Sequence, residues 1–164
     1  MSTNPVLILT TTAALGAAAV GGLFYAFSTF TMRGLSRTDP HDAITAMRGI
    51  NAEAQANAPF LVLFLGSSVL ALAVGVLAVT QLDRPGSAYL LAGAALSVVA
   101  LIVTIAFNVP LNNRLDAVHP DGLSAAEAAR VWVAYCVPWK AWNHVRTAAP
   151  LVGAVLMLAG TRYR

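Results

Sequence analysis

Near its C-terminal end the chain carries a tight cluster of residues able to act on a bound molecule, in the stretch 139–147. His144 is a base near neutral pH. Arg146 and Asn143 carry N–H groups that can stabilise a developing oxyanion. On a helix, Trp139, Asn143 and Arg146 share one face. A base, several hydrogen-bond donors and indole rings within three helical turns indicate acid–base chemistry on an apolar ligand.

The apolar segment that follows is too short to cross a membrane unless this cluster enters the bilayer. Residues 147–161 are 15 residues without a charged side chain, which make roughly 22 Å of helix. A bilayer core is about 30 Å thick and needs about 20 residues. The helix must therefore begin near Pro138 or Trp139, which places Asn143, His144 and Arg146 at or below the edge of the hydrocarbon. Polar groups at that depth are costly unless partnered and are functional candidates.

Three further intervals lack charged side chains: 1–32, 54–82 and 85–113. Hydrophobic residues make up 58% of the chain and charged residues only 10%, which leaves no polar face for the helices of a soluble core. We therefore predict an all-α integral membrane protein, a single four-span domain over residues 1–164. It forms an up-down-up-down four-helix bundle with spans near residues 5–27, 59–80, 88–107 and 139–160.

Four spans place both termini and the turn at 81–87 on one side of the membrane, and two connections of about 30 residues each on the other. The density of positive charge beside the span ends favours cytoplasmic termini. A raw count of Lys and Arg instead favours a cytoplasmic location for the long connections. We expect an integral protein of a bacterial-type cytoplasmic membrane, in contact with lipid. Small residues at Ala13, Ala17 and Gly21 predict close helix packing. We assign this packing to contacts within one bundle. The alternative is that the small residues form the interface of a homo-oligomer.

The long connections carry helix-start signals. Asp39-Pro40 is typical of an N-cap followed by proline at the first helical position. Ser124 and Glu127 have capping-box spacing. We expect two loop helices that lie at the interface or fold over the bundle as a lid.

Polar side chains gather where the four predicted spans meet the long connections. They are Tyr25, Ser28 and Thr29 after the first span; Asn51, Glu53, Gln55 and Asn57 before the second; Asn108, Asn112 and Asn113 after the third; and Asn143, His144 and Arg146 in the fourth. The opposite end has nothing similar. This convergence predicts a pocket between helices, opening near one interface.

The main candidates also have purely structural interpretations. Asn51 and Glu53 could belong to a solvated face of the loop helix, and His144 could be an interfacial histidine bonded to a carbonyl. Arg146 could snorkel to lipid phosphate or rest on the Trp142 ring. Asn108 could be a C-terminal helix cap, with Pro110 ending the helix. Trp139 and Trp142 would suit an interfacial aromatic belt.

Two other kinds of function are disfavoured. The histidines His41, His119 and His144 lack the spacing of a metal motif, so no metal site is predicted; a loop histidine reaching His144 to ligate haem is the remaining alternative. No basic run suggests nucleic acid as a partner.

Four strings then suggest a family: 22–30 (GLFYAFSTF), 46–51 (AMRGIN), 108–112 (NVPLN) and 139–147 (WKAWNHVRT). In order and spacing they resemble the anthrone-oxygenase-like family of small integral membrane proteins, across nearly the whole chain. The resemblance implies a four-helix membrane fold and directs attention to Asn51, Asn108, Asn143, His144 and Arg146. Fungal members oxidise anthrones to anthraquinones with O₂ and without an organic cofactor, whereas many bacterial members have no assigned function.

The resemblance implies a definable reaction. A base removes a benzylic proton from a flat aromatic ketone, the enolate reacts with O₂, and loss of water gives the quinone. We expect His144 to be the base, and Arg146, Asn143 and Asn108 to donate to the oxyanion. The expected substrate-binding residues are Asn51, Phe24, Phe27, Trp139 and Trp142. O₂ is the co-substrate, and no cofactor or metal is expected.

A different class of function remains open. The same pocket could belong to a non-enzymatic membrane binding module or accessory subunit that holds a lipid, a quinone or a partner helix. Arg146 would then grip a headgroup or carbonyl, and His144 would only orient it.

Overall fold

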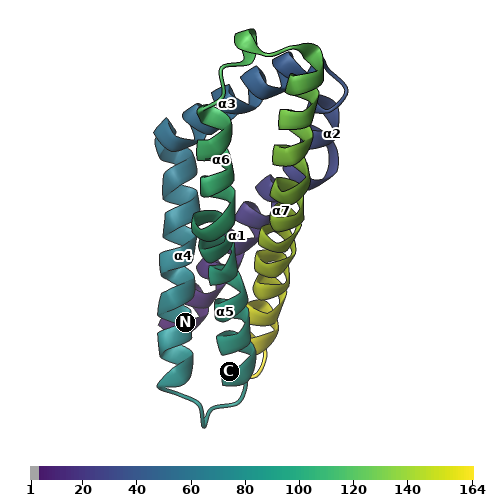
Figure 1. Ribbon diagram of the computed structural model, residues 1–164. Coiled ribbons are helices and arrows are strands. Elements are labelled where there is room, and N and C mark those ends of the chain that lie inside the picture. Colours follow the sequence, from purple (N-terminus) through teal and green to yellow (C-terminus); the bar gives the residue numbers. More distant parts are fainter. Residues whose placement is uncertain (1–3) are drawn as a thin grey trace.

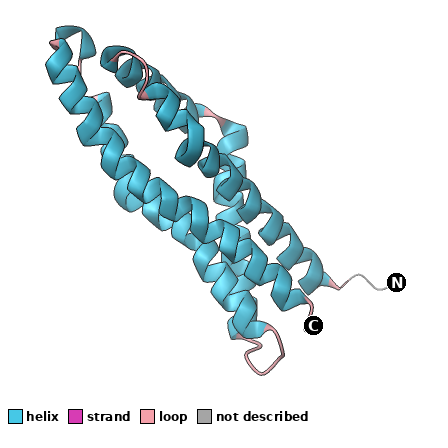
Figure 2. Ribbon diagram, turned by 90° about the vertical axis from the view of Figure 1, so that its right-hand side faces the viewer, coloured by secondary structure: helices cyan, strands magenta, loops and turns pink. Residues whose placement is uncertain are grey.

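Four long helical rods run side by side in the computed structural model, which describes residues 4–164 (Figure 1). They are built on α1 (Pro5–Ala26), α4 (Ala58–Val79), α5 (Ser87–Val103) and α7 (Ala125–Thr161). No strand occurs in the described part of the chain (Figure 2). The predicted all-α, four-helix architecture is confirmed.

The four rods have the form of a membrane helical bundle. Each contains a segment long and apolar enough to span a bilayer. Large apolar side chains point outward along them, for example Val62 and Val155, which are 73% and 65% exposed. Such faces are stable in lipid and not in water. The start of α1, the α4–α5 turn and the end of α7 lie at one end of the bundle, as the up-down-up-down order requires (Figures 1 and 2).

Two rods continue beyond the predicted span ends through a turn of π-helix. The first passes from α1 through η1 (Phe27–Thr31) into α2 (Met32–Leu35), and the third from α5 through η2 (Thr104–Asn108) into α6 (Val109–Asp116). Pro110 therefore does not end the helix, and Asn108 is not a C-terminal cap. Proline lacks an N–H, and the wider π turn just before it, in which the Val109 N–H donates to the Thr104 carbonyl, carries the helix through.

The fourth rod, α7, is one continuous helix of 37 residues. The capping box of Ser124 and Glu127 forms as predicted. However, the helix that it opens is not a separate loop helix, because it runs through Pro138 into the predicted fourth span. The lost hydrogen bond at Pro138 is offset by packing on either side of it, since Tyr135 and Trp139 are both buried in one apolar cluster.

The long connections and the helix extensions fold into a cap at one end of the bundle (Figure 1). The cap consists of α2, α3 (Pro40–Ala56), α6, η3 (Pro120–Gly122) and α7 as far as Trp139. Its core contains ten buried residues: Met32, Ala43, Ile44, Met47, Leu115, Ala128, Trp132, Tyr135, Cys136 and Trp139. Of the two arrangements expected for the connections, the structure shows the one that folds over the bundle.

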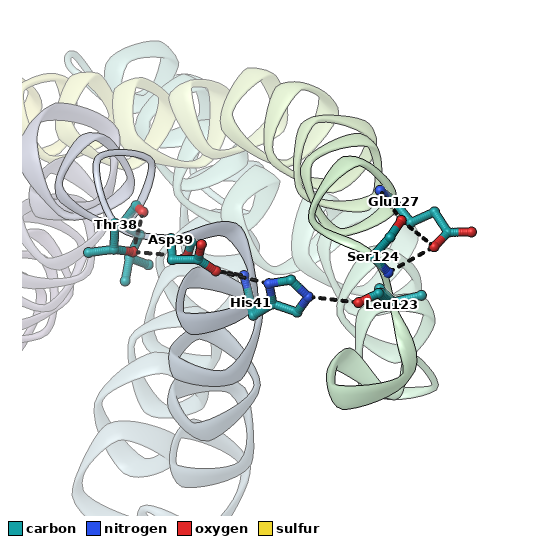
Figure 3. A network of polar contacts seen from close by, with 7 residues as sticks. Thr38, Asp39, His41, Leu123, Ser124 and Glu127 are labelled. Atoms are coloured by element: carbon teal, nitrogen blue, oxygen red, sulfur yellow. Dashed lines mark hydrogen bonds and ion pairs between the residues drawn. The ribbon is translucent and has the colours of Figure 1, made fainter.

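A polar clasp ties the start of α3 to the segment before α7 (Figure 3). The Asp39 side chain accepts hydrogen bonds from the backbone N–H and ring Nδ1 of His41, both at 2.9 Å. The other ring nitrogen, Nε2, lies 3.1 Å from the carbonyl oxygen of Leu123. The clasp therefore joins two segments that are far apart in sequence.

At the other end, α5 and α7 touch through their backbones. A Cβ added to Gly93 would lie 2.6 Å from the carbonyl oxygen of Gly153, and a Cβ added to Gly153 would lie 2.6 Å from that of Gly93. The predicted small-residue face of α1 also packs within the bundle, where Gly21 lies against Leu151 of α7.

Candidate functional site

A cavity of about 760 Å³ lies where the cap meets the bundle. Its walls are mainly apolar, with Leu23, Phe24, Phe27, Met47, Ile50, Phe60, Leu61, Phe64, Leu65, Leu101, Ile105, Val109 and Trp139. The polar lining residues are Asn51, Glu53, Gln55, Asn57, Thr104, Asn112, Asn113 and Arg146. A hollow of this size with few polar groups suits an apolar small molecule of several rings.

Arg146 is the cation of this cavity. It is only 5% exposed, and its Nε donates to the Asn143 side-chain oxygen at 2.7 Å. Its Nη1 lies 3.4 Å from the hydroxyl of Thr104. Among residues 4–164 the only ion pair joins His41 to Asp39, so Arg146 has no carboxylate partner. A buried guanidinium without an anion presents a strong donor group to whatever occupies the cavity.

Two aromatic rings hold the guanidinium in place. Its Cζ lies 4.1 Å from the Phe24 ring centroid and 4.7 Å from that of Trp139, both within cation–π distance. The predicted alternatives for Arg146 are therefore wrong: it neither snorkels to a headgroup nor rests on Trp142. Trp142 stacks instead on Phe107, with ring centroids 3.6 Å apart, and does not line the cavity.

Asn143 orients the arginine from behind. It is fully buried, and its Nδ2 donates to the Phe24 carbonyl at 2.9 Å and to the Ser28 hydroxyl at 2.7 Å. The Phe24 carbonyl stands where α1 passes into η1, and it also accepts a hydrogen bond from the Phe27 backbone N–H. Both ends of the Asn143 amide are thus engaged, so Asn143 positions Arg146 and keeps no group for a ligand.

On the cap side, Asn112 joins two aromatic residues of α7. Its Oδ1 accepts hydrogen bonds from the Tyr135 hydroxyl at 3.0 Å and from the Trp139 indole N–H at 2.9 Å. These bonds fix the ring of Trp139, which forms one wall beside Arg146. Asn51 of α3 lines the same cavity and is 4% exposed.

The structure brings five of the nine predicted site residues to the cavity: Phe24, Phe27, Asn51, Trp139 and Arg146. Asn143 and Asn108 lie behind its wall. Asn108 is fully buried and donates to the Trp139 carbonyl at 3.3 Å, so it supports the helix that carries the site.

His144 is not brought to the cavity. It is exposed and does not appear in the cavity wall. The reason is helical geometry: His144 is about 100° from Asn143 and about 200° from Arg146 around the helix, so inward-facing Asn143 and Arg146 turn it outward. His144 was predicted to lie in the site because it is next to Asn143 in the sequence. It does not, because it projects from the outward face of the helix. Within the described residues, no three His, Cys, Asp or Glu side chains gather as a metal site would require.

Glu53 is a cavity residue that the sequence places near the predicted pocket but to which it assigned no role. It is the one carboxylate in the wall, and its Oε1 accepts a hydrogen bond from Asn57 Nδ2 at 3.2 Å. In the sequence nothing separates Glu53 from the other polar residues ahead of the second span. The one available signal is its place two residues after Asn51, close to the predicted pocket.

Fold and site together define a class, a small helical membrane protein whose cap covers an apolar cavity containing one buried cation. The sequence matches the model of a protein family described as anthrone oxygenase over residues 50–156. This match covers more than half of the 164 residues, and the chain belongs to the anthrone oxygenase family. The curated proteins and the solved structures contain no significant match to the chain.

Proposed function

We propose that the cavity binds an apolar, enolisable aromatic ketone of the anthrone type and that the protein promotes its oxidation by O₂ without an organic cofactor or metal. The observation that carries this proposal is Arg146, a buried cation without a carboxylate partner in the wall of an apolar, aromatic cavity. The family match supports the same class of reaction.

Arg146 stabilises the negative charge that forms when the ketone becomes an enolate. Its planar, permanently charged N–H groups suit an oxyanion, and the apolar surroundings strengthen the interaction. Phe24 and Trp139 already hold the guanidinium, so it need not reorganise as charge develops. The aromatic side chains lining the cavity pack against the flat rings of the substrate.

Glu53 replaces His144 as the proposed base. Among the described residues, it is the only carboxylate in the cavity wall, and no histidine lines that wall. A positioned carboxylate is an effective base when the product anion is stabilised nearby, which is the role given to Arg146. The two groups together would remove the benzylic proton and hold the enolate.

The oxidation then balances with O₂ alone. A bond forms between the benzylic carbon and O₂, and the peroxide formed takes up a proton. Loss of the second benzylic hydrogen with cleavage of the O–O bond yields the new carbonyl and one molecule of water. One CH₂ group is oxidised by four electrons, and one O₂ is fully reduced.

The substrate enters from the lipid. Leu65 of α4 and Ile105 of η2 line the cavity and are also exposed on the outer surface of the bundle, 48% and 63% respectively. Apolar side chains that face both the cavity and the bilayer offer a route to a hydrophobic molecule dissolved in the membrane.

The test is O₂ uptake by the purified protein in lipid nanodiscs with anthrone, corrected for spontaneous oxidation. The proposal expects acceleration that survives exhaustive chelation. If activity disappears on chelation and returns with iron or copper, the metal-free reaction is wrong. If anthrone binds without any acceleration, the protein is a binding module that holds an apolar ligand.

A further inference from the structure

The cavity borders an opening between α4 and the third rod. Five apolar residues line the cavity on the two sides of this opening: Leu61 and Leu65 of α4, and Leu101, Ile105 and Val109 of the third rod. Leu65, Ile105 and Val109 are also exposed. On each helix these residues recur four positions apart, so each border is a single helical face. We call the opening between the two faces the lateral slot.

The lateral slot is closed at both ends. Towards the α4–α5 turn these two helices pack together, and at the cap α3 packs against α6. Between those levels, α4 makes no comparable contact with η2 or α6 among the described residues. The π turn of η2 followed by Pro110 accounts for the separation, because helices kink at such features. The residues that border the slot belong to segments apolar enough to span a bilayer, so the slot faces acyl chains.

Arg146 lies directly behind the lateral slot. Its Nη1 is 3.4 Å from the hydroxyl of Thr104, and the next residue of the third rod is Ile105, which is 63% exposed. An oxygen held by Arg146 is therefore close to the slot. A long substituent on the ring carbon beside the carbonyl group would have an apolar exit there.

The cavity is also large for a three-ring ketone. Pockets for drug-sized ligands measure about 300–1,000 Å³, and the 760 Å³ of this cavity lies in the upper part of that range. The extra space continues into the slot, where every bordering side chain is apolar. Such a passage suits a hydrocarbon chain and offers nothing to a polar substituent.

We propose that the ligand is an aromatic ketone with a long apolar chain beside its carbonyl group. The ring occupies the cavity with its oxygen on Arg146, and the chain lies in the lateral slot and extends into the bilayer. This inference rests on the proposed function for the identity of the ring system. It goes beyond entry from the lipid, because a molecule that only passes through the slot leaves it, whereas the chain stays in it.

The test compares fluorenone with 1-decylfluorenone, whose chain is beside the carbonyl; neither has a CH₂ group within its ring system to be oxidised. Affinities for the full chain in nanodiscs are expressed as mole fractions of ligand in the lipid. The chain moves from one apolar environment to another, so wild type should bind both ketones within about fivefold. Leu65→Trp and Ile105→Trp narrow the slot and should weaken 1-decylfluorenone about tenfold or more, while fluorenone changes by about twofold or less.

Val62→Trp and Ile102→Trp are the matched controls, since both residues are exposed on the same two helices and neither lines the cavity. They should leave both affinities unchanged. A wild type that discriminates more strongly against the decyl compound overturns the proposal. So does any pattern in the variants other than a loss confined to the slot substitutions and to the chain-bearing ketone. An equal loss of both ketones, for example, would mean that Leu65 and Ile105 shape the ring site.

A second measurement needs no variant. 1-Decylfluorenone with a diazirine in its chain is activated by light on wild type, and the labelled residues are located by mass spectrometry. Labelling that excess fluorenone suppresses should fall on the residues that border the slot, and its absence from them overturns the proposal. Neither ketone is a substrate, so these results do not depend on turnover. A chain-selective loss in a protein that consumes no O₂ would keep the chain in the slot and refute the oxidation.

Discussion

In the proposed reaction, Arg146 stabilises the oxyanion through its planar geometry as well as its positive charge. Its Nε is engaged by Asn143, its Nη1 by Thr104, and its Cζ lies over two aromatic rings, which leaves the remaining N–H groups for the ligand. Arg146→Lys keeps the charge but loses the planar group, so we expect anthrone oxidation to fall at least about 100-fold. O₂ uptake in nanodiscs measures the rate, with an unchanged melting temperature as the control for folding. Full activity in the lysine variant would show that charge alone suffices.

The two candidate bases can be separated by one pair of variants. Removing a general base typically costs about 10²–10⁴ in rate. Glu53→Gln, which keeps the size of the side chain, should cause a loss of that order because Glu53 lines the cavity. His144→Gln is the matched comparison and should retain nearly wild-type turnover, since His144 faces outward. The reverse pattern would restore His144 as the base and refute the role of Glu53.

At the residue scale, the spacing of residues on one face of the fourth helix predicted part of the candidate site. The positions of the other residues in the site depend on contacts between segments that are distant in the sequence. Arg146, Asn143 and Trp139 were predictable because they recur on one face of a helix that must be buried. The orientation of Asn112 was not, because it depends on Tyr135 and Trp139, which are more than 20 residues away in the sequence. Glu53 enters the cavity only because α3 folds over the bundle.

At the element scale, charge-free intervals located the membrane segments and missed the helices' full lengths. The predicted ends at residues 27 and 107 fall in η1 and η2, where the rods pass from bundle to cap. Beyond them the helices are stabilised by packing within the cap, which hydropathy does not report. The close approach of α5 and α7 was also missed, because Gly93 and Gly153 lie on different segments and spacing within one helix does not reveal such a pair.

That contact gives a stability prediction. Gly93→Ala places a methyl group within 3 Å of the α7 backbone, and Gly153→Ala does the same against α5. Each should destabilise the protein by about 1–3 kcal/mol through overpacking. Gly22→Ala, in α1 with open space around the added carbon, is the control and should stabilise by up to about 1 kcal/mol. Thermal unfolding in detergent, followed by circular dichroism, measures all three. If all three substitutions change stability equally, helix propensity and not the contact between α5 and α7 determines the effect of alanine at these positions.

At the scale of the whole molecule, the cap is held closed in part by the clasp at His41 (Figure 3). Both ring nitrogens face acceptors, the Leu123 carbonyl and the Asp39 carboxylate, so the protonated ring makes both bonds. The pKa of His41 is raised above 6.5, first by the hydrogen bond to Leu123 and then by that to Asp39. Its contribution to stability is therefore complete below pH 6.5 and is lost as the pH rises through the raised pKa.

Proteolysis of the cap should show this dependence. We expect cleavage at residues 117–124 to become faster as the pH rises from about 6 to about 8. His41→Gln should remove most of the change, because glutamine has no proton to lose in this range. His119, exposed in the same segment, provides the matched variant His119→Gln, which should keep the pH dependence. A pH effect that survives in His41→Gln would place the titrating group elsewhere.

The side chains that face both the cavity and the bilayer, Leu65 and Ile105, have a kinetic consequence. A substrate that enters through this wall comes from the bilayer and not from water. The fraction of cavities that it occupies therefore depends on its mole fraction in the lipid. The KM expressed as total concentration should then scale with the amount of lipid present. Adding empty vesicles at constant total substrate should slow the reaction by surface dilution, whereas a protein loaded from water would respond only to the free aqueous concentration.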